Sequence, residues 1–181
     1  QHNMDLSYQL TEEDFMEYQM FQSSNSEPLK KRRLISRVIL SLFYIAIAAY
    51  FKLIREQSGT AMIFAGAGVV WYFFYPTYAK WRYKNHFKRH IKANYQDRIG
   101  KSATLSIVSD GIDFDDSSGN AHVKAEALAH LIELKDYFLV TIDTGLSLIV
   151  PKHAIENQDD FKNQLMAFDM QYHDEREWIW S

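Results

Sequence analysis

The chain has 181 residues, of which 47% are hydrophobic, and a formal net charge of −3 at neutral pH. It contains no cysteine, which excludes disulfide bonds, thiolate nucleophiles and cysteine-ligated metals. Because the mean hydropathy is only −0.31, the apolar residues must be concentrated in part of the chain.

Residues 4–29 are expected to form a strand and a helix that dock on a sheet formed later in the chain. Leu6 to Leu10 alternates as a strand does, and Thr11 with Asp14 three residues on resembles a capping box. These signals predict a helix over about residues 12–22 and a linker over 23–28. The segment from Met4 is polar and acidic, so it does not have the character of a signal peptide. Residues 1–3 are left out of the fold prediction.

Two adjacent apolar segments, 34–54 and 59–79, are predicted to be transmembrane helices. Each has 21 residues; the first carries only Arg37 and Lys52 as charges, near its two ends, and the second carries none. Such a helix is about 31 Å long, close to the ~30 Å hydrocarbon core of a bilayer. The four residues between the segments permit only a tight antiparallel turn. The alternative, a hairpin buried in a soluble core, needs more apolar chain around it than is present.

Small residues predict the contact between the two helices. Ala46 and Ala49 of the first are expected to face Ala61, Ala65 and Gly68 of the second, since small side chains let helices approach closely in lipid. Pro76 is expected in the last turn of the second helix, where neighbouring groups can bond the carbonyl that it leaves free.

Basic residues flank the hairpin on both sides. Residues 30–33 form a basic flank, and residues 80–98 are predicted to be a basic juxtamembrane helix. By the positive-inside rule both flanks, and hence both termini, are cytoplasmic in a multi-pass protein of the inner (plasma) membrane. These flanks either bind anionic lipid headgroups or serve only to set topology. The expected membrane-interface residues are Lys30, Lys31, Arg32, Arg33, Lys80, Trp81, Arg82 and Lys84.

Residues 102–170 are predicted to be a cytoplasmic β domain. The hydrophobic period changes to two, and a helix over 158–168 closes the domain. With the N-terminal strand this gives seven strands, and the lack of βαβ alternation predicts an antiparallel sheet. The acidic, aromatic tail, 171–181, is expected to cover the sheet, with docking of a partner as the alternative. The strands are predicted at 103–108, 112–115, 121–125, 131–135, 137–143 and 146–150.

Two motifs carry a resemblance to a known family. Residues 8–15, with Tyr8, Leu10 and Asp14, and residues 148–155, with Pro151 and Lys152, are similar to motifs of the YcxB-like proteins of bacteria, and the hairpin lies between them as it does there. The resemblance implies a pleckstrin-homology-like fold for the β domain. It implies no activity, so no catalytic residue is carried over.

Three local patterns could carry chemistry, and each has a simpler interpretation. Asp143-Thr144-Gly145 resembles an aspartic-protease loop, but no later glycine follows to buttress it, and it suits a hairpin turn. His86 and His90 have a zinc-binding spacing, yet lie among Lys and Arg residues that repel a cation. The acids at 110, 113, 115 and 116 do not have the spacing of an EF-hand loop.

The sequence therefore predicts a membrane α-helical hairpin plus an α+β cytoplasmic domain with a pleckstrin-homology-like antiparallel β-sheet or barrel and a C-terminal helix. We expect a non-enzymatic membrane protein whose β domain binds a protein partner or assembles with itself, with no cofactor, no metal and no nucleic acid. The alternatives are an immunity or stress-protection protein and, less favoured, a membrane-bound hydrolase using Asp143.

Overall fold

The computed structural model describes residues 4–180; residues 1–3, which were left out of the fold prediction, and 181 lie outside the described part. The chain divides into two compact units. The β unit consists of residues 4–18 and 88–179, and the helical unit consists of residues 19–87 with Trp180. Helices α1 (Glu12–Asn25) and α3 (Ser58–Asn94) each contribute to both units.

The first sheet of the β unit is antiparallel, with the order β1-β2-β3-β4. It joins the N-terminal strand to strands more than 90 residues away, since Leu6 lies opposite Leu105 and Leu105 lies opposite Phe114. These three side chains are buried, and on each strand the residues next to the buried position largely face solvent. This alternation is the pattern that predicted the strands. The strands are β1 (Met4–Gln9), β2 (Ser102–Val108), β3 (Gly111–Asp116) and β4 (Gly119–Lys124).

The second sheet has the order β7-β6-β5-β8 and is mixed. Its strands are β5 (Leu128–Glu133), β6 (Tyr137–Ile142), β7 (Ser147–Pro151) and β8 (Gln171–Asp174). Strand β8 runs parallel to β5, so the predictions of seven strands and of a wholly antiparallel sheet were wrong. The sequence of β8 is polar throughout and lies on the sheet edge, where no apolar alternation is needed.

Helix α4 (Gln158–Met166) completes the core of the β unit. The Asn157 side chain caps it by accepting a hydrogen bond from the Asp160 backbone N–H, and Phe161 and Leu165 are fully buried. The Phe161 ring centroid lies 5.4 Å from that of Phe138 on β6. The coarse expectation of an α+β domain closed by a late helix is therefore confirmed.

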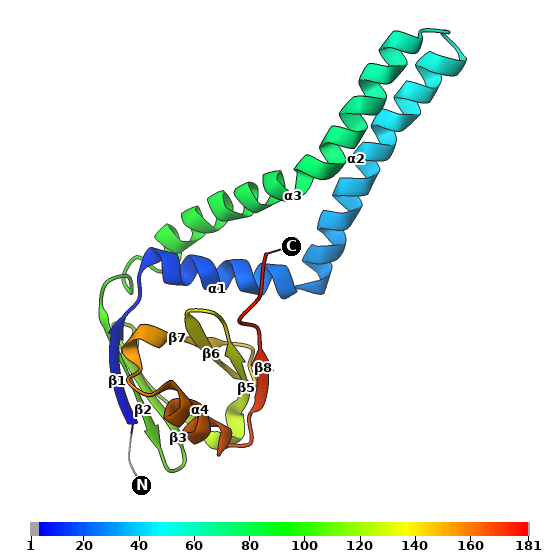
Figure 1. Cartoon of the computed structure of the whole chain (residues 1–181). Helices are drawn as coiled ribbons and strands as arrows, with labels where there is room; N and C mark the ends of the chain where they lie inside the picture. Colours follow the sequence, from blue (N-terminus) through cyan, green and yellow to red (C-terminus); the bar gives the residue numbers. More distant parts are fainter. Residues whose placement is uncertain (1–3, 181) are drawn as a thin grey trace. The chain divides into compact units, whose positions relative to one another are not determined.

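The helical unit contains a hairpin of two long helices, α2 (Glu27–Leu53) and the first part of α3 (Figure 1). The predicted linker over 23–28 is absent: α1 continues to Asn25, and Ser26 alone separates it from α2. Pro28 lies in the first turn of α2, where its missing N–H costs no helical hydrogen bond. The basic flank 30–33 is thus helical.

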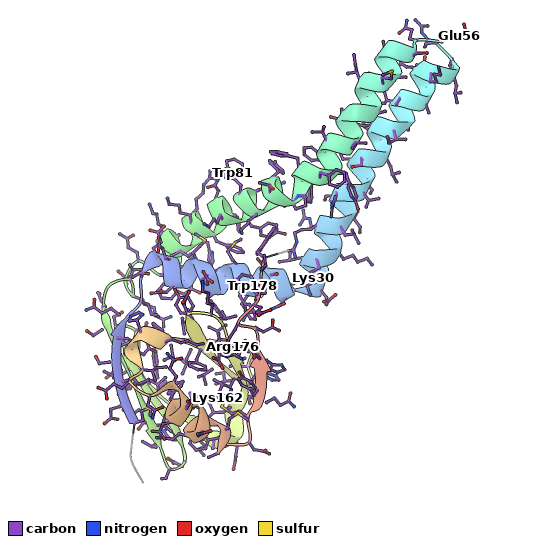
Figure 2. All side chains as sticks on the ribbon, in the orientation of Figure 1. Lys30, Glu56, Trp81, Lys162, Arg176 and Trp178 are labelled. Atoms are coloured by element: carbon purple, nitrogen blue, oxygen red, sulfur yellow. The ribbon has the colours of Figure 1, made fainter. Side chains whose placement is uncertain are left out.

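Pro76 lies in the interior of α3 and not in the last turn of a separate helix, as was predicted, because the second apolar segment and the basic segment form one helix that continues to Asn94. The helix bends instead (Figure 1), on the N-terminal side of Trp81 (Figure 2). A proline inside a helix removes one hydrogen bond and crowds the preceding turn, which is the usual cause of such a bend.

The hairpin contact uses the predicted face of α3, where Ala61 and Gly68 are buried, but a different face of α2 from the one predicted. Ala46 and Ala49 are exposed, whereas Ala48 is buried and Gly68 packs against Ser41 and Tyr44. The positions of small residues were therefore not enough to predict which face of α2 turns toward α3. The α2 contact follows a spacing of three and four residues through positions 41, 44, 48 and 51, as in a coiled-coil seam.

Apolar side chains cover the outer surface of the hairpin (Figure 2). Among the described residues, all the exposed large apolar side chains except Leu146 and Ile179 lie between positions 34 and 81. Leu53 is 78% exposed, Met62 74% and Phe73 72%. Helices α2 and α3 are both long and apolar enough to cross a membrane.

Candidate functional site: a basic pocket at the base of the hairpin

A pocket of about 380 Å³ lies between α2 and α3, at the end of the hairpin opposite the connecting turn; we call it the hairpin-base pocket. Cavities of this size suit small ligands or lipid headgroups. Basic and aromatic side chains dominate its lining. From α2 come Leu29, Arg32, Arg33 and Ser36, and from α3 come Tyr75, Tyr78, Ala79, Arg82, Tyr83, His86 and Phe87.

Two of the predicted membrane-interface arginines, Arg32 and Arg82, are exposed within this pocket, as is His86. Among residues 4–180, no carboxylate forms an ion pair with either arginine or with this histidine. The guanidinium groups of Arg32 and Arg82 are therefore not neutralised by a carboxylate of the described residues. Of the two histidines with a zinc-binding spacing, His86 lines the pocket and His90 does not.

Arg33 has a different, structural position. It is 7% exposed, and its Nη1 donates a hydrogen bond of 3.0 Å to the Ser23 backbone oxygen. Its guanidinium lies over the Trp180 ring, 4.9 Å from the centroid, and over Tyr83 at 5.6 Å. Cation–π contacts of this kind are stabilising when desolvated.

Trp180 is thus packed within the helical unit. It is 8% exposed, and its indole Nε1 donates to Ser23 Oγ at 3.3 Å. For this tryptophan the structure favours intramolecular packing, within the helical unit, over docking of a partner.

The remaining predicted interface residues, Lys30, Lys31, Lys80, Trp81 and Lys84, lie exposed on the surfaces of α2 and α3. The four lysines and Trp81 are close to the pocket residues in sequence, but their side chains do not line the pocket. The sequence placed all eight residues at the interface equally. The structure separates those that line the pocket from those that face outward.

Arg37 bonds the carbonyl that Pro76 leaves without a helical donor. In a regular helix the Tyr72 carbonyl would accept from the N–H of residue 76, which proline lacks. Arg37 Nε donates to this oxygen at 2.8 Å, and its guanidinium lies 3.9 Å from the Tyr72 ring centroid. The two helices are joined at the bend by this contact, which sequence spacing alone did not reveal.

The opening family motif forms a junction within the β unit. Asp14 Oδ2 accepts a hydrogen bond from the Thr11 backbone N–H at 2.6 Å, and the Asp14 backbone N–H donates to Thr11 Oγ1 at 3.3 Å, which together form the predicted capping box. Its other oxygen, Oδ1, accepts from the Tyr137 hydroxyl at 2.6 Å. Burial and the Asp14 carboxylate raise the pKa of Tyr137 above its ordinary value. Tyr8 and Leu10 are buried, so this motif builds the core.

The second motif neutralises a buried carboxylate. Pro151 is fully buried, and Lys152 Nζ lies 2.7 Å from Glu133 Oε1 on β5. Glu133 Oε2 accepts from the Tyr172 hydroxyl at 2.6 Å and lies 3.5 Å from Lys162 Nζ. Burial alone would raise the pKa of Glu133, but the bonds from Lys152 and Tyr172 and the nearby lysine charges hold it below its ordinary value.

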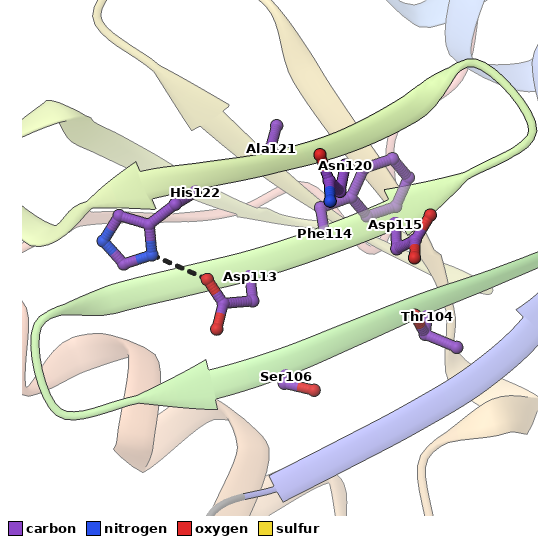
Figure 3. A pocket seen from close by; sticks show the side chains of 8 residues that line it. All are labelled: Thr104, Ser106, Asp113, Phe114, Asp115, Asn120, Ala121 and His122. Carbon is purple, nitrogen blue, oxygen red and sulfur yellow. Dashed lines mark hydrogen bonds and ion pairs between the residues drawn. The ribbon is translucent and has the colours of Figure 1, made fainter.

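A second pocket, of about 400 Å³, lies on the polar face of the first sheet (Figure 3). His122 Nδ1 is 2.6 Å from Asp113 Oδ1, and Ser106 lies opposite Asp113 on the neighbouring strand. Asp113 stands between the serine and the histidine in this row, so the histidine is not placed to activate the serine. Within the described part of the chain, no group of three or more potential ligands could hold a metal ion.

Asp143 lies exposed in the turn between β6 and β7. The turn is closed by hydrogen bonds from Gly145 N to the Ile142 oxygen and from Ile142 N to the Leu146 oxygen, both at 2.9 Å. Gly145 has a φ of +84°, which glycine adopts without strain. This geometry is that of a hairpin turn and does not bury the carboxylate as a protease loop would.

One comparison with known proteins identifies a relationship. Neither a curated protein nor a solved structure matches the chain. The family described as YcxB-like protein matches residues 109–165, a segment that runs from the start of β3 through most of α4 and includes Pro151 and Lys152. Over this segment the chain is similar to the YcxB-like family, in agreement with the family that the two motifs indicated.

Proposed function

We propose that the protein is a non-enzymatic integral protein of the inner (plasma) membrane that crosses the bilayer twice and presents a pleckstrin-homology-like β domain to the cytoplasm for protein binding, either of a partner or of a second copy. The proposal rests mainly on the exposed apolar surface of the hairpin. Water would solvate side chains such as Leu53, Met62 and Phe73 at a large cost, whereas lipid removes that cost.

Charge supports the proposed orientation. Lys30 and Trp81 lie at the base of the hairpin, while Glu56 lies at its tip (Figure 2). Basic residues flanking both spans favour retention of the base on the cytoplasmic side. The short turn is then the only part of residues 4–180 on the far side of the membrane.

The cysteine-free chain makes this topology directly measurable. A Gln57→Cys chain carries its single thiol in the turn, and a Ser118→Cys chain carries it in the β3–β4 turn. A membrane-impermeant maleimide applied to intact cells should label Cys at 57 and should label Cys at 118 only after permeabilisation. The reverse pattern, or equal labelling of both, would refute the orientation.

Two features support the interaction role of the β domain. Its two sheets and the packed helix α4 form a scaffold compatible with a pleckstrin-homology-like fold. Strand β4 is paired on one side only, and five of its six residues are exposed. Such an edge is a ready template for adding a strand from another chain.

A photoreactive amino acid placed at Asn120 on β4 tests this role in cells. We expect a discrete crosslinked product from this site, identified by mass spectrometry as a protein partner or as a second copy. Asn163 on α4, also exposed, provides the matched control and should give no such product. Absence of any product at Asn120 would count against the proposal.

A further inference from the structure

The hairpin-base pocket has features that membrane insertion alone does not require. A transmembrane hairpin needs basic residues near its cytoplasmic ends, but these can project into solvent. Here Arg32 and Arg82, from different helices, line the same cavity together with His86. We infer that this pocket binds the phosphate of an anionic phospholipid headgroup, an inference that rests on the proposed insertion of the hairpin.

The chemistry of the lining suits a phosphodiester. Guanidinium groups bind phosphate oxygens through paired hydrogen bonds, and neither Arg32 nor Arg82 is neutralised by a carboxylate among the described residues. The ring N–H of His86 and the hydroxyl of Ser36 can donate further bonds. A volume of about 380 Å³ leaves room for a phosphate with a small alcohol such as glycerol.

The position of the pocket favours a lipid over a soluble phosphate. On α2 the exposed apolar surface begins at Leu34, which follows Arg33 directly and is 58% exposed. On α3 it extends to Phe74, which is 54% exposed and precedes the pocket residue Tyr75, and Trp81, 62% exposed, lies further along within the stretch of α3 that lines the pocket. A headgroup in the pocket would therefore have acyl chains next to apolar helix surface. Tyrosines at this level are typical of the membrane interface.

The structure also explains why the pocket stays open. Arg33, which could otherwise occupy it, is held by the Ser23 backbone oxygen and the Trp180 ring. Arg37 holds α2 and α3 together at the bend, beyond which the helices diverge (Figure 1). The remaining arginines are thereby left available to a ligand.

The test measures lipid retained by the full-length chain in a neutral detergent, using native mass spectrometry with added phosphatidylglycerol or phosphatidylcholine. We expect one phosphatidylglycerol per chain, preferred over phosphatidylcholine by at least about tenfold. The double variant Arg32→Gln, Arg82→Gln should abolish this preference. So should Ser36→Phe, which fills the pocket and leaves the charge unchanged.

The double variant Lys31→Gln, Lys80→Gln is the matched control. It removes the same charge from the same two helices, next to the pocket residues but outside the lining. It should keep the preference within about threefold of the original. Equal loss in the two double variants would mean a diffuse charge effect and would overturn the inference.

Two further arms separate the remaining outcomes. Displacement of phosphatidylglycerol by millimolar inorganic phosphate would assign the pocket to a soluble anion and overturn the lipid. Alkaline extraction of membranes tests insertion separately: release of the original chain refutes the proposed function, whereas retention without lipid preference refutes only the pocket. Both double variants should remain in the membrane pellet after alkaline extraction.

Discussion

Glu133 is held by partners from several elements of the β unit. Lys152 follows β7, Lys162 belongs to α4, and Tyr172 belongs to β8, so one carboxylate connects the family motif with the last helix and the last strand. Its side chain is 10% exposed and that of Lys152 12%. A carboxylate with so little water around it depends on these partners for its charge.

Replacement of Lys152 by methionine should therefore destabilise the β unit. Loss of the 2.7 Å bond leaves Glu133 with the Tyr172 hydroxyl and the longer contacts to Lys162 and Arg176, at an expected cost of about 2–3 kcal/mol in the free energy of unfolding. Denaturant titration of the full chain in detergent measures it. Lys135→Met, at an exposed position, is the control and should change stability by less than about 0.5 kcal/mol. Equal effects of the two substitutions would contradict this role.

At the scale of elements, the hairpin depends on one close approach between α2 and α3. A Cβ atom on Gly68 would lie 3.2 Å from the Ser41 oxygen and 3.2 Å from Tyr44 Cβ, while one on Gly66 would have no neighbour within 4 Å. Gly68→Leu should thus force the helices apart and cost about 1–3 kcal/mol. Gly66→Leu should not lower the melting temperature measured in detergent. A lower melting temperature for the second variant alone would show that the helices meet along another face.

The contact of Arg37 with the bend of α3 also joins the two helices. Arg37→Met leaves the Tyr72 carbonyl without a donor and should destabilise the hairpin by about 1–3 kcal/mol. Pro76→Ala returns a helical N–H to that carbonyl, so in this background Arg37→Met should cost clearly less. A double-mutant cycle by thermal melting in detergent gives the coupling. Strict additivity of the two substitutions would exclude the proposed link.

At the scale of the whole molecule, titratable groups set a pH range for the stability of the β unit. Glu133 and Asp116 have pKa values held below their ordinary values, Glu133 by Lys152 and Tyr172 and Asp116 by Ser118 and Arg98, in each case against the effect of burial. Their contribution is present at neutral pH and is lost as pH falls below about 4. Burial raises the pKa values of Tyr8 and Tyr137, so their contribution is present below about pH 10 and is lost above it.

The melting temperature of the β unit should accordingly fall on both sides of a plateau near neutral pH. Tyr137→Phe removes one of the two phenols. The fall in melting temperature at alkaline pH should then be less steep, while the fall at acid pH should be unchanged. Circular dichroism at a series of pH values measures both limbs. An unchanged alkaline limb in this variant would show that Tyr137 does not contribute to it.

Local sequence signals are enough to predict the order and the type of most elements. Apolar segments long enough to span a bilayer, a change of hydrophobic period at residue 103 and the capping box at Thr11 are local signals, and each predicts its element without reference to the rest of the chain. The two family motifs likewise indicated the family that matches residues 109–165.

Features that depend on contacts between residues distant in sequence could not be predicted from local signals. Strand β8 is polar and exists because β5 supplies hydrogen bonds to its edge. The face by which α2 meets α3, the bond from Arg37 to the Tyr72 carbonyl and the pocket shared by Arg32 and Arg82 all depend on helix rotation and on the bend. Residue type sets the tendency to form a helix, but the packing of two helices sets their rotation. For this reason the sequence predicted all the basic residues at a membrane interface alike, and the structure shows which of them line a common pocket.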